Sequence, residues 1–225
     1  MARQPTQLGN PDGSAVDGTN VDELTRGELQ GRQQALDAFT FIRDNAPGFA
    51  DSYIVDLAPQ IGIRETRRII GEYRLTEDDV LGCADFPDTI GVNGWPVEAH
   101  VAGSVEFRWP RGEDPRGFSQ LPFRMMLPGS VPGGSGPSGS GVPPGGAVLP
   151  RASTVRNLYV IGRCASMTHG AQSAARVTGP CFAMGEAAGT AAGMALAGGI
   201  ACGAVDVAAL QQRLERHGAY LGRSL

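Results

Sequence analysis

The clearest pattern of apolar and polar positions lies in the C-terminal third of the chain, where a short apolar run leads toward a helix start. The run Leu158–Ile161 is short and partly β-branched, so it predicts a buried strand that ends at Gly162. Further along, Thr178, Gly179 and Pro180 form a helix-start signal. The free N–H groups and the positive dipole end of that helix would face an anion.

The helix that follows is predicted over Cys181–Ala197 and consists almost entirely of alanine, glycine and methionine. Its Gly185, Gly189 and Gly193 are four residues apart and share one face. Each internal glycine destabilises a helix by roughly 0.5 to 1 kcal/mol relative to alanine. Three on one face therefore predict close contact with a sheet or a planar ligand, and a tightly packed core helix is the alternative.

The first half of the chain predicts one long helix and two strands. The helix should begin at Thr25, with Glu28 as its capping-box partner, and stop before Pro47. Strands are predicted over Ser52–Leu57 and Ile61–Tyr73, and the second mixes apolar and charged residues instead of alternating cleanly.

Two shorter helices and a linker complete the pattern. Thr76 is a predicted N-cap with three acidic residues in the first turn after it. Asp206 is the predicted N-cap of a terminal amphipathic helix within Val205–Leu221, which should pack on the sheet. The tract Gly129–Gly146 is rich in Gly, Pro and Ser and predicts a flexible, solvent-facing linker.

Composition narrows the class of protein. The chain has 225 residues with 33 Gly, 16 Pro and a net charge of −4, and all of its basic side chains are Arg. Without a concentrated basic patch, nucleic acid is an unexpected partner. No charged start followed by an apolar stretch stands at Met1, which favours the cytoplasm. The most apolar stretch, Cys181–Ile200, contains Glu186 and little besides Ala and Gly, so no membrane span is expected.

Cysteine spacing argues against a metal centre. Cys83, Cys164, Cys181 and Cys202 are widely spaced and contain no C-x-x-C pair, so an iron–sulfur cluster or a structural zinc is not expected.

Two blocks of sequence each carry a motif. The block Pro59–Leu81 is similar to the pattern IGxRExRRIxGxYxLTxxDV. The second block carries, in order, Asn157, Leu158, Gly162, Arg163, Cys164, Ser166, Thr168, His169, Arg176, Val177, Pro180, Cys181, Gly185, Ala187, Ala188 and Gly189. Together the two blocks resemble the FAD-dependent oxidoreductases related to the flavoprotein subunit of heterodisulfide reductase. The second block departs from the pattern of that family at Ile161 and Glu186.

This resemblance implies an α+β or α/β fold: a substrate-domain mixed sheet plus the C-terminal strand–helix portion of a Rossmann-like FAD-binding domain. A G-x-G-x-x-G turn after a strand is missing, so that domain is expected to be incomplete, as in a fragment. The implied division is a polar lead-in (1–24), a helix plus substrate-domain sheet that includes a returning strand at Leu121–Pro128 (25–128), a flexible linker (129–148), the C-terminal part of the FAD-binding domain (149–202) and a terminal amphipathic helix (203–225).

The same resemblance implies FAD as cofactor and a small organic molecule as substrate. His100 and Arg64 are the candidate catalytic residues, with a structural histidine and an ion-paired strand arginine as the alternatives. Cys164 and Cys181 fall near the flavin in the family, and small buried thiols are the alternative for both. The implied cofactor-binding residues are Gly162, Arg163, Cys164, His169, Arg176, Thr178, Gly179, Pro180, Cys181 and Gly185.

Three interpretations of function follow. The first is an oxidoreductase portion that transfers a hydride between an organic substrate and FAD. The second is a non-catalytic remnant that binds no cofactor. The third is an interaction subunit completed by a separate chain that carries the nucleotide-binding half.

Overall fold

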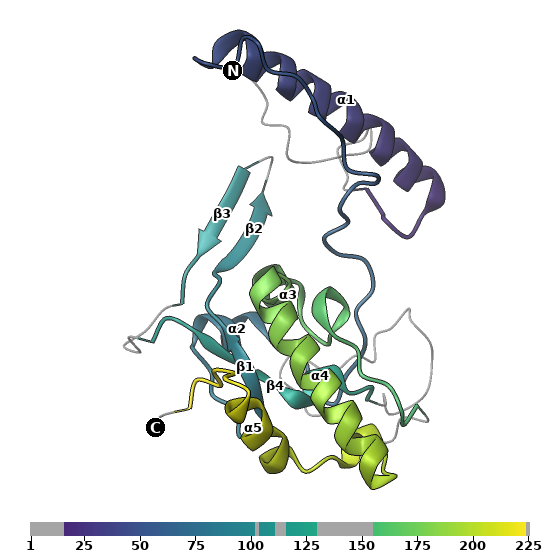
Figure 1. The fold of residues 1–225 in the computed structure, drawn as a ribbon, viewed down its shortest axis with the longest axis vertical. Coiled ribbons are helices and arrows are strands. Elements are labelled where there is room, and N and C mark those ends of the chain that lie inside the picture. The colour runs from purple at the N-terminus through teal and green to yellow at the C-terminus, as the bar shows by residue number, and fades with distance from the viewer. Residues whose placement is uncertain (1–15, 102–103, 111–115, 130–154, 224–225) are drawn as a thin grey trace. The chain divides into compact units, whose positions relative to one another are not determined.

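The computed structural model describes residues 16–101, 104–110, 116–129 and 155–223, and for 99–101 and 104 the backbone only. Most of the predicted linker therefore lies outside the described residues. The chain forms two compact units, Met1–Thr66 with His100–Ser104, and Arg67–Ala99 with Val105–Leu225. Each unit is described by itself (Figure 1).

The first unit is built on the long helix α1, Val21–Asn45. The helix stops before Pro47 as predicted, but its predicted start at Thr25 is wrong. Asn20 is the N-cap, and its side chain accepts two N–H groups of the first turn, so the helix begins one turn earlier. Glu28 makes no capping box because its carboxylate accepts the Ile61 N–H at 2.7 Å.

Both predicted strands in the first half are wrong. Ser52–Leu57 is extended without a strand partner, and Ile61–Tyr73 contributes only an isolated bridge, between Gly71 and Pro128. A strand needs a continuous ladder with a neighbour, and the end of the second segment makes only separate backbone hydrogen bonds, such as those from the Ile69 N–H to the Cys164 carbonyl and from the Glu72 N–H to the Leu127 carbonyl. In the first unit the segment is instead held against α1 through Glu28 and Arg32.

The second unit contains most of two small antiparallel pairs of strands. β1 (Thr89–Asn93) pairs antiparallel with β4 (Ser119–Pro122), with a shift of register between Thr89 and Val92. β2 (Val97–Val101) pairs with β3 (Ser104–Arg108). The predicted strand Leu121–Pro128 is cut short, because the chain turns after Pro122 into the 3-10 helix η1, Phe123–Met126.

The predicted helices of this unit are confirmed with shifted ends. Thr76 and Asp79 form a capping box at the first of them, and Asp206 caps the last with its carboxylate. That last helix stops at Arg216, short of the predicted Leu221. The elements are α2 (Glu77–Leu81), η2 (Gly162–Cys164), α3 (His169–Ala175), α4 (Thr178–Gly198), η3 (Cys202–Ala204) and α5 (Val207–Arg216).

The core of the second unit forms where α4 and α5 pack on β1 (Figure 1). A Cβ at Gly91 of β1 would lie 2.9 Å from the Ala183 Cβ, so glycine allows the close approach of α4. On α5, the buried Gln211 amide donates to the carbonyls of Pro87 and Thr89, each at 3.0 Å, which confirms that the terminal helix packs on the sheet.

The predicted strand Leu158–Ile161 is also absent. The segment is extended, and Val160 donates its N–H to the Met126 carbonyl at 2.9 Å, but no ladder forms. Helices together with small antiparallel sheets make the observed fold α+β. None of the helices in the described ranges is both long and apolar enough to cross a membrane.

Candidate functional site

The predicted cofactor residues lie on three consecutive elements of the second unit: η2, α3 and the first half of α4. η2 packs against both helices. Gly162 opens it with a φ of 63°, in the left-handed region that favours glycine. The structure therefore groups all ten predicted cofactor residues in one part of one unit.

The first turn of α4 differs from the other α-helix starts in the described chain. Side chains cap the other four, through Asn20, Thr76, Thr168 and Asp206. The N-cap of α4 is Val177, which has no side-chain acceptor. The first N–H groups of α4 thus lack the side-chain partner that the other helices have, which suits an external anion.

The residues of this first turn are also open to an approaching group. Thr178 and Gly179 are exposed, and a Cβ at Gly179 would meet no atom within 4 Å. Pro180 is buried and contributes no N–H, so Thr178 and Gly179 carry the free donors nearest the helix start.

Cys181 ties this turn to α3 and η2. Its thiol donates to the Arg176 carbonyl at 3.1 Å. A Cβ at Gly162 would lie 3.6 Å from the Cys181 Sγ. Burial raises the pKa of the Cys181 thiol, so the sulfur stays protonated and acts as a small packing group near neutral pH.

The remaining candidates differ in exposure. Arg163 and His169 are exposed, at η2 and at the first residue of α3. Arg176 follows α3 as its C-cap, and Cys164 is half-buried with its carbonyl accepting the Ile69 N–H at 2.9 Å. Arg163 thus lies in η2, ahead of α3, and Arg176 lies between α3 and α4.

The predicted catalytic residues belong to the other unit. Arg64 is exposed and lies outside any strand, so the interpretation of a strand arginine is wrong. His100 lies in β2, and its side chain is outside the description. In the second unit, the start of β2 is held to α3 because the Glu98 N–H donates to the Ser173 hydroxyl at 3.2 Å.

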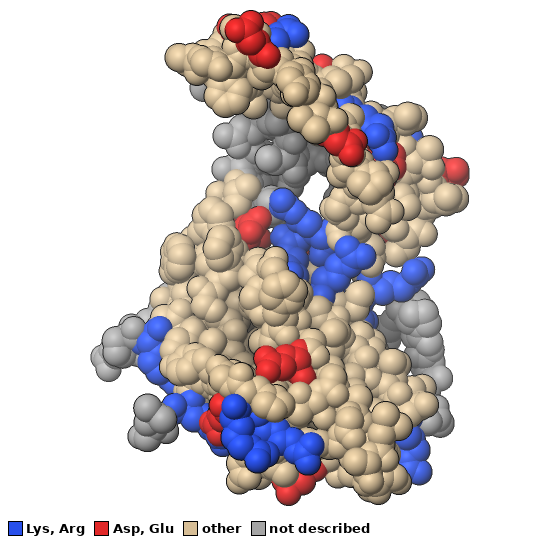
Figure 2. Space-filling view, in the orientation of Figure 1, with Lys and Arg blue, Asp and Glu red and all other residues tan. Residues whose placement is uncertain are grey.

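The outer face of α4 exposes large apolar side chains together with Glu186, and the described residues do not cover it. Phe182 is 73% exposed and Leu196 is 83% exposed. Cβ atoms at Gly189 and Gly193 would meet nothing within 4 Å, so the described residues make no close contact with these two glycines. Figure 2 shows the surface over α4 as uncharged apart from one acidic patch, and Glu186 is the exposed acidic residue of this helix. The helix packs on β1 through its opposite face.

One buried network had no signal in the sequence. Arg124 of η1 donates to both carboxylate oxygens of Asp88, at 2.9 and 3.1 Å, and its guanidinium lies over the Tyr73 ring. The Tyr73 hydroxyl donates to Asp79, the α2 capping residue. Because Asp88 and Arg124 are far apart in sequence, only the fold reveals this network.

A comparison with protein families decides the assignment. The model of the family described as FAD dependent oxidoreductase matches residues 3–133 and 143–214. The chain belongs to this family. No curated protein and no solved structure matches it. Family membership gives the chain a general flavin oxidoreductase role with FAD as cofactor, and the matched segments include every predicted site residue.

The observed residues fit this cofactor. The uncapped start of α4 offers N–H donors and the positive helix end to a pyrophosphate, and Gly162 leaves the neighbouring loop without a side chain. Glu186 departs from the family pattern, and its exposed side chain lies two turns into α4.

Proposed function

We propose that this chain supplies the C-terminal, cofactor-contacting part of a Rossmann-like FAD-binding domain together with a substrate domain. The complete enzyme transfers a hydride between a small organic substrate and FAD, and is related to the flavoprotein subunit of heterodisulfide reductase. The observation that carries this proposal is the uncapped start of α4 beside the left-handed Gly162.

Each element has a distinct role in holding the cofactor. The N–H groups of Thr178 and Gly179 bind the pyrophosphate, and the Arg163 guanidinium balances its charge. Bound FAD would supply the hydride chemistry. The rest of the cofactor surface is contributed by Gly162, Cys164, His169, Arg176, Pro180, Cys181 and Gly185.

The substrate roles follow the family resemblance. His100 holds or releases a proton at its imidazole, and Arg64 binds an acidic group of the substrate.

The outer face of α4 supports a partner. Large apolar side chains exposed on one helix face commonly mark an interaction surface, and Phe182 and Leu196 are exposed on α4. We propose that a nucleotide-binding half, carried by a separate chain, covers this face and completes the FAD site.

Flavin content and intact mass of the protein, purified under native conditions from its source, test these proposals together. A yellow complex heavier than this chain supports a flavoenzyme completed by a partner. A colourless protein that also fails to bind added FAD would overturn the proposal in favour of a non-catalytic remnant.

A substitution tests the assignment of Arg163. In a preparation that binds flavin, Arg163→Ala should weaken FAD affinity by about tenfold, the effect of losing one charged hydrogen bond. Arg213→Ala, an exposed arginine on α5, is the matched control and should leave the affinity unchanged. Equal FAD affinities for wild type and Arg163→Ala would contradict the role given to Arg163.

A further inference from the structure

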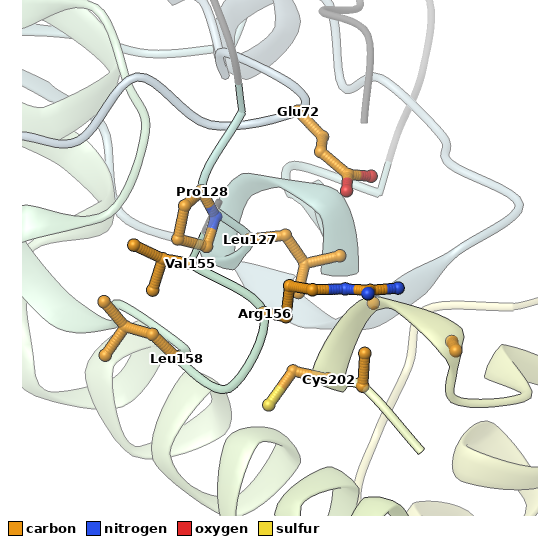
Figure 3. A pocket seen from close by; sticks show the side chains of 10 residues that line it. Glu72, Leu127, Pro128, Val155, Arg156, Leu158 and Cys202 are labelled. Carbon is orange, nitrogen blue, oxygen red and sulfur yellow. The ribbon is translucent and has the colours of Figure 1, made fainter. Parts of the chain in front are cut away.

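A pocket of ≈ 120 Å³ lies in the second unit beside η3, just after the end of α4 (Figure 3). Ala201 and Cys202 line it, whereas Thr178 and Gly179, the proposed pyrophosphate contacts, begin α4. That helix has 21 residues and is therefore about 30 Å long. Among the described residues that line the pocket, none is a predicted cofactor residue, so the pocket is distinct from the proposed flavin site.

The Arg156 guanidinium gives this pocket an open positive charge. Arg156 lines the pocket and is exposed. Within the described part of the chain, its side chain makes neither a hydrogen bond nor an ion pair. A guanidinium stays charged at all physiological pH values and presents several N–H donors in one plane. Its donors are thus available to an anionic group that enters the pocket.

The backbone around Arg156 is held in place. The Arg156 carbonyl accepts the Cys202 N–H at 2.9 Å, and the Tyr159 hydroxyl donates to the Cys202 carbonyl at 2.8 Å. The Tyr159 ring in turn packs on the Phe123 ring, with the two centroids 5.7 Å apart. The segment that carries Arg156 and the start of η3 are therefore joined on both sides of Cys202, which keeps these two walls of the pocket together.

Apolar side chains form much of the remaining wall. In Figure 3, Pro128, Val155 and Leu158 lie on the other side of the view from the Arg156 guanidinium. A dry cavity of roughly 150 Å³ holds a molecule the size of benzene, so this pocket suits an aliphatic group of about four carbons. A dinucleotide is too large for it.

Glu72 also lines the pocket, but it is not the group that selects the ligand. It is 6% exposed and already has an interaction partner in the structure. An amine would therefore find no open carboxylate here. The group left for recognition is the Arg156 guanidinium, which favours an anion.

We propose that this pocket binds a small branched aliphatic monocarboxylate of about the size of isovalerate. The ligand carboxylate accepts N–H groups of Arg156, because the planar guanidinium matches a carboxylate in shape and charge. The aliphatic tail lies against Pro128, Val155 and Leu158. This proposal does not depend on flavin binding.

An NMR titration of the full chain with three matched probes tests the proposal. Isovaleramide has the shape of isovalerate without its charge, and acetate has the charge without the branched tail. Isovalerate should bind at least about tenfold more tightly than either of the other two probes. Its binding should shift the backbone amide signals of Cys202 and Gly203, which line the pocket, and leave those of Thr178 and Gly179 in place.

Two results of this titration would overturn the proposal. One is an isovalerate affinity no higher than that of isovaleramide or of acetate. The other is a set of shifts at Thr178 and Gly179 in place of Cys202 and Gly203, which would mean that the anion binds at the start of α4.

Variants identify the groups that bind. Arg156→Gln should weaken isovalerate binding by about tenfold or more and remove the preference for isovalerate over isovaleramide. Arg213→Gln is the matched control, since it removes an exposed arginine from α5 and should change neither affinity. Ala201→Leu, which places a larger side chain at the pocket wall, should remove the preference for isovalerate over acetate. Unchanged isovalerate affinity in Arg156→Gln contradicts the site, whatever the flavin measurements show.

Discussion

The helices α4 and α5 pack side by side on the same small sheet, yet only α5 has the features of an ordinary surface helix. α5 is capped by the Asp206 carboxylate, buries Leu210 and Leu214, and turns charged residues outward. α4 starts without a side-chain cap and exposes Phe182 and Leu196 on its outer face. Described residues of the chain cap α5 and cover its apolar face. The first turn of α4 and its outer face remain open to a bound molecule.

The difference between α4 and α5 distinguishes residues that stabilise the fold from residues that can bind other molecules. A helix whose polar groups are capped and whose apolar face is covered contributes to folding. A helix that leaves donors and apolar side chains open gives up some of that stability, and the donors and the face become available for a cofactor and a partner.

The largest expected effect is on the free energy of unfolding, and it distinguishes the buried face of α5 from the open face of α4. Leu214→Ala should lower the free energy of unfolding by about 2 to 5 kcal/mol, because Leu214 is 1% exposed and its loss leaves a cavity. Leu196→Ala, on the open face of α4, should change it by less than about 0.5 kcal/mol. Urea denaturation of both variants gives the comparison. A loss at Leu196 as large as that at Leu214 would mean that the α4 face is covered within the chain.

The next effect concerns the left-handed residue of η2. Gly162→Ala should cost about 1 to 3 kcal/mol, because alanine is strained at a φ of 63° although its Cβ would only make an ordinary contact with Cys181. Gly162→Asn should retain more stability, since asparagine tolerates this conformation better. Thermal or urea unfolding distinguishes them, and equal losses would point to crowding in place of backbone strain.

Substitutions at the two N-caps should change the free energy of unfolding in opposite directions for α5 and α4. Asp206→Ala should lower the free energy of unfolding by about 1 kcal/mol. Val177→Asp should raise it by a similar amount by supplying the missing cap of α4. The same Val177→Asp change should weaken FAD binding, because the new carboxylate takes the N–H donors and repels phosphate. A stabilised variant with undiminished FAD affinity would disprove the role given to these donors.

The smallest effect is a loss of stability at high pH. Burial, followed by a hydrogen bond to Asp79, raises the pKa of Tyr73 above its ordinary value of 10.0, and burial does the same for Tyr159. Both phenols hold their protons more tightly when folded, so their contribution is complete below pH 10.0 and is lost as the pH rises beyond it. Denaturation curves across this range should become less pH-dependent in Tyr73→Phe and in Tyr159→Phe. An unaltered pH profile in both would assign the alkaline loss to other groups.

Much of the candidate site could be predicted from the sequence because it consists of helix starts and glycines. The residues from Gly162 to Gly185 lie close together along the chain, and the structure groups them on η2, α3 and α4. What could not be predicted was the missing cap at Val177, which is visible only against four capped helices, and the open space at Gly189. Arg64 and His100 lie far away in sequence, and the structure assigns them to the other unit.

The sequence by itself determined where α1, α2, α4 and α5 lie, the caps at Thr76 and Asp206, and the stop before Pro47, because helical hydrogen bonds join residues four apart and end groups are satisfied locally. It also determined the family, through motifs that need no folding to be read. Only the tertiary structure decided that Leu158–Ile161 forms no strand, and that Glu28 binds the backbone of Ile61 instead of capping a helix. A strand, a pocket or a close approach of two elements depends on partners distant in the chain, and local sequence does not specify them.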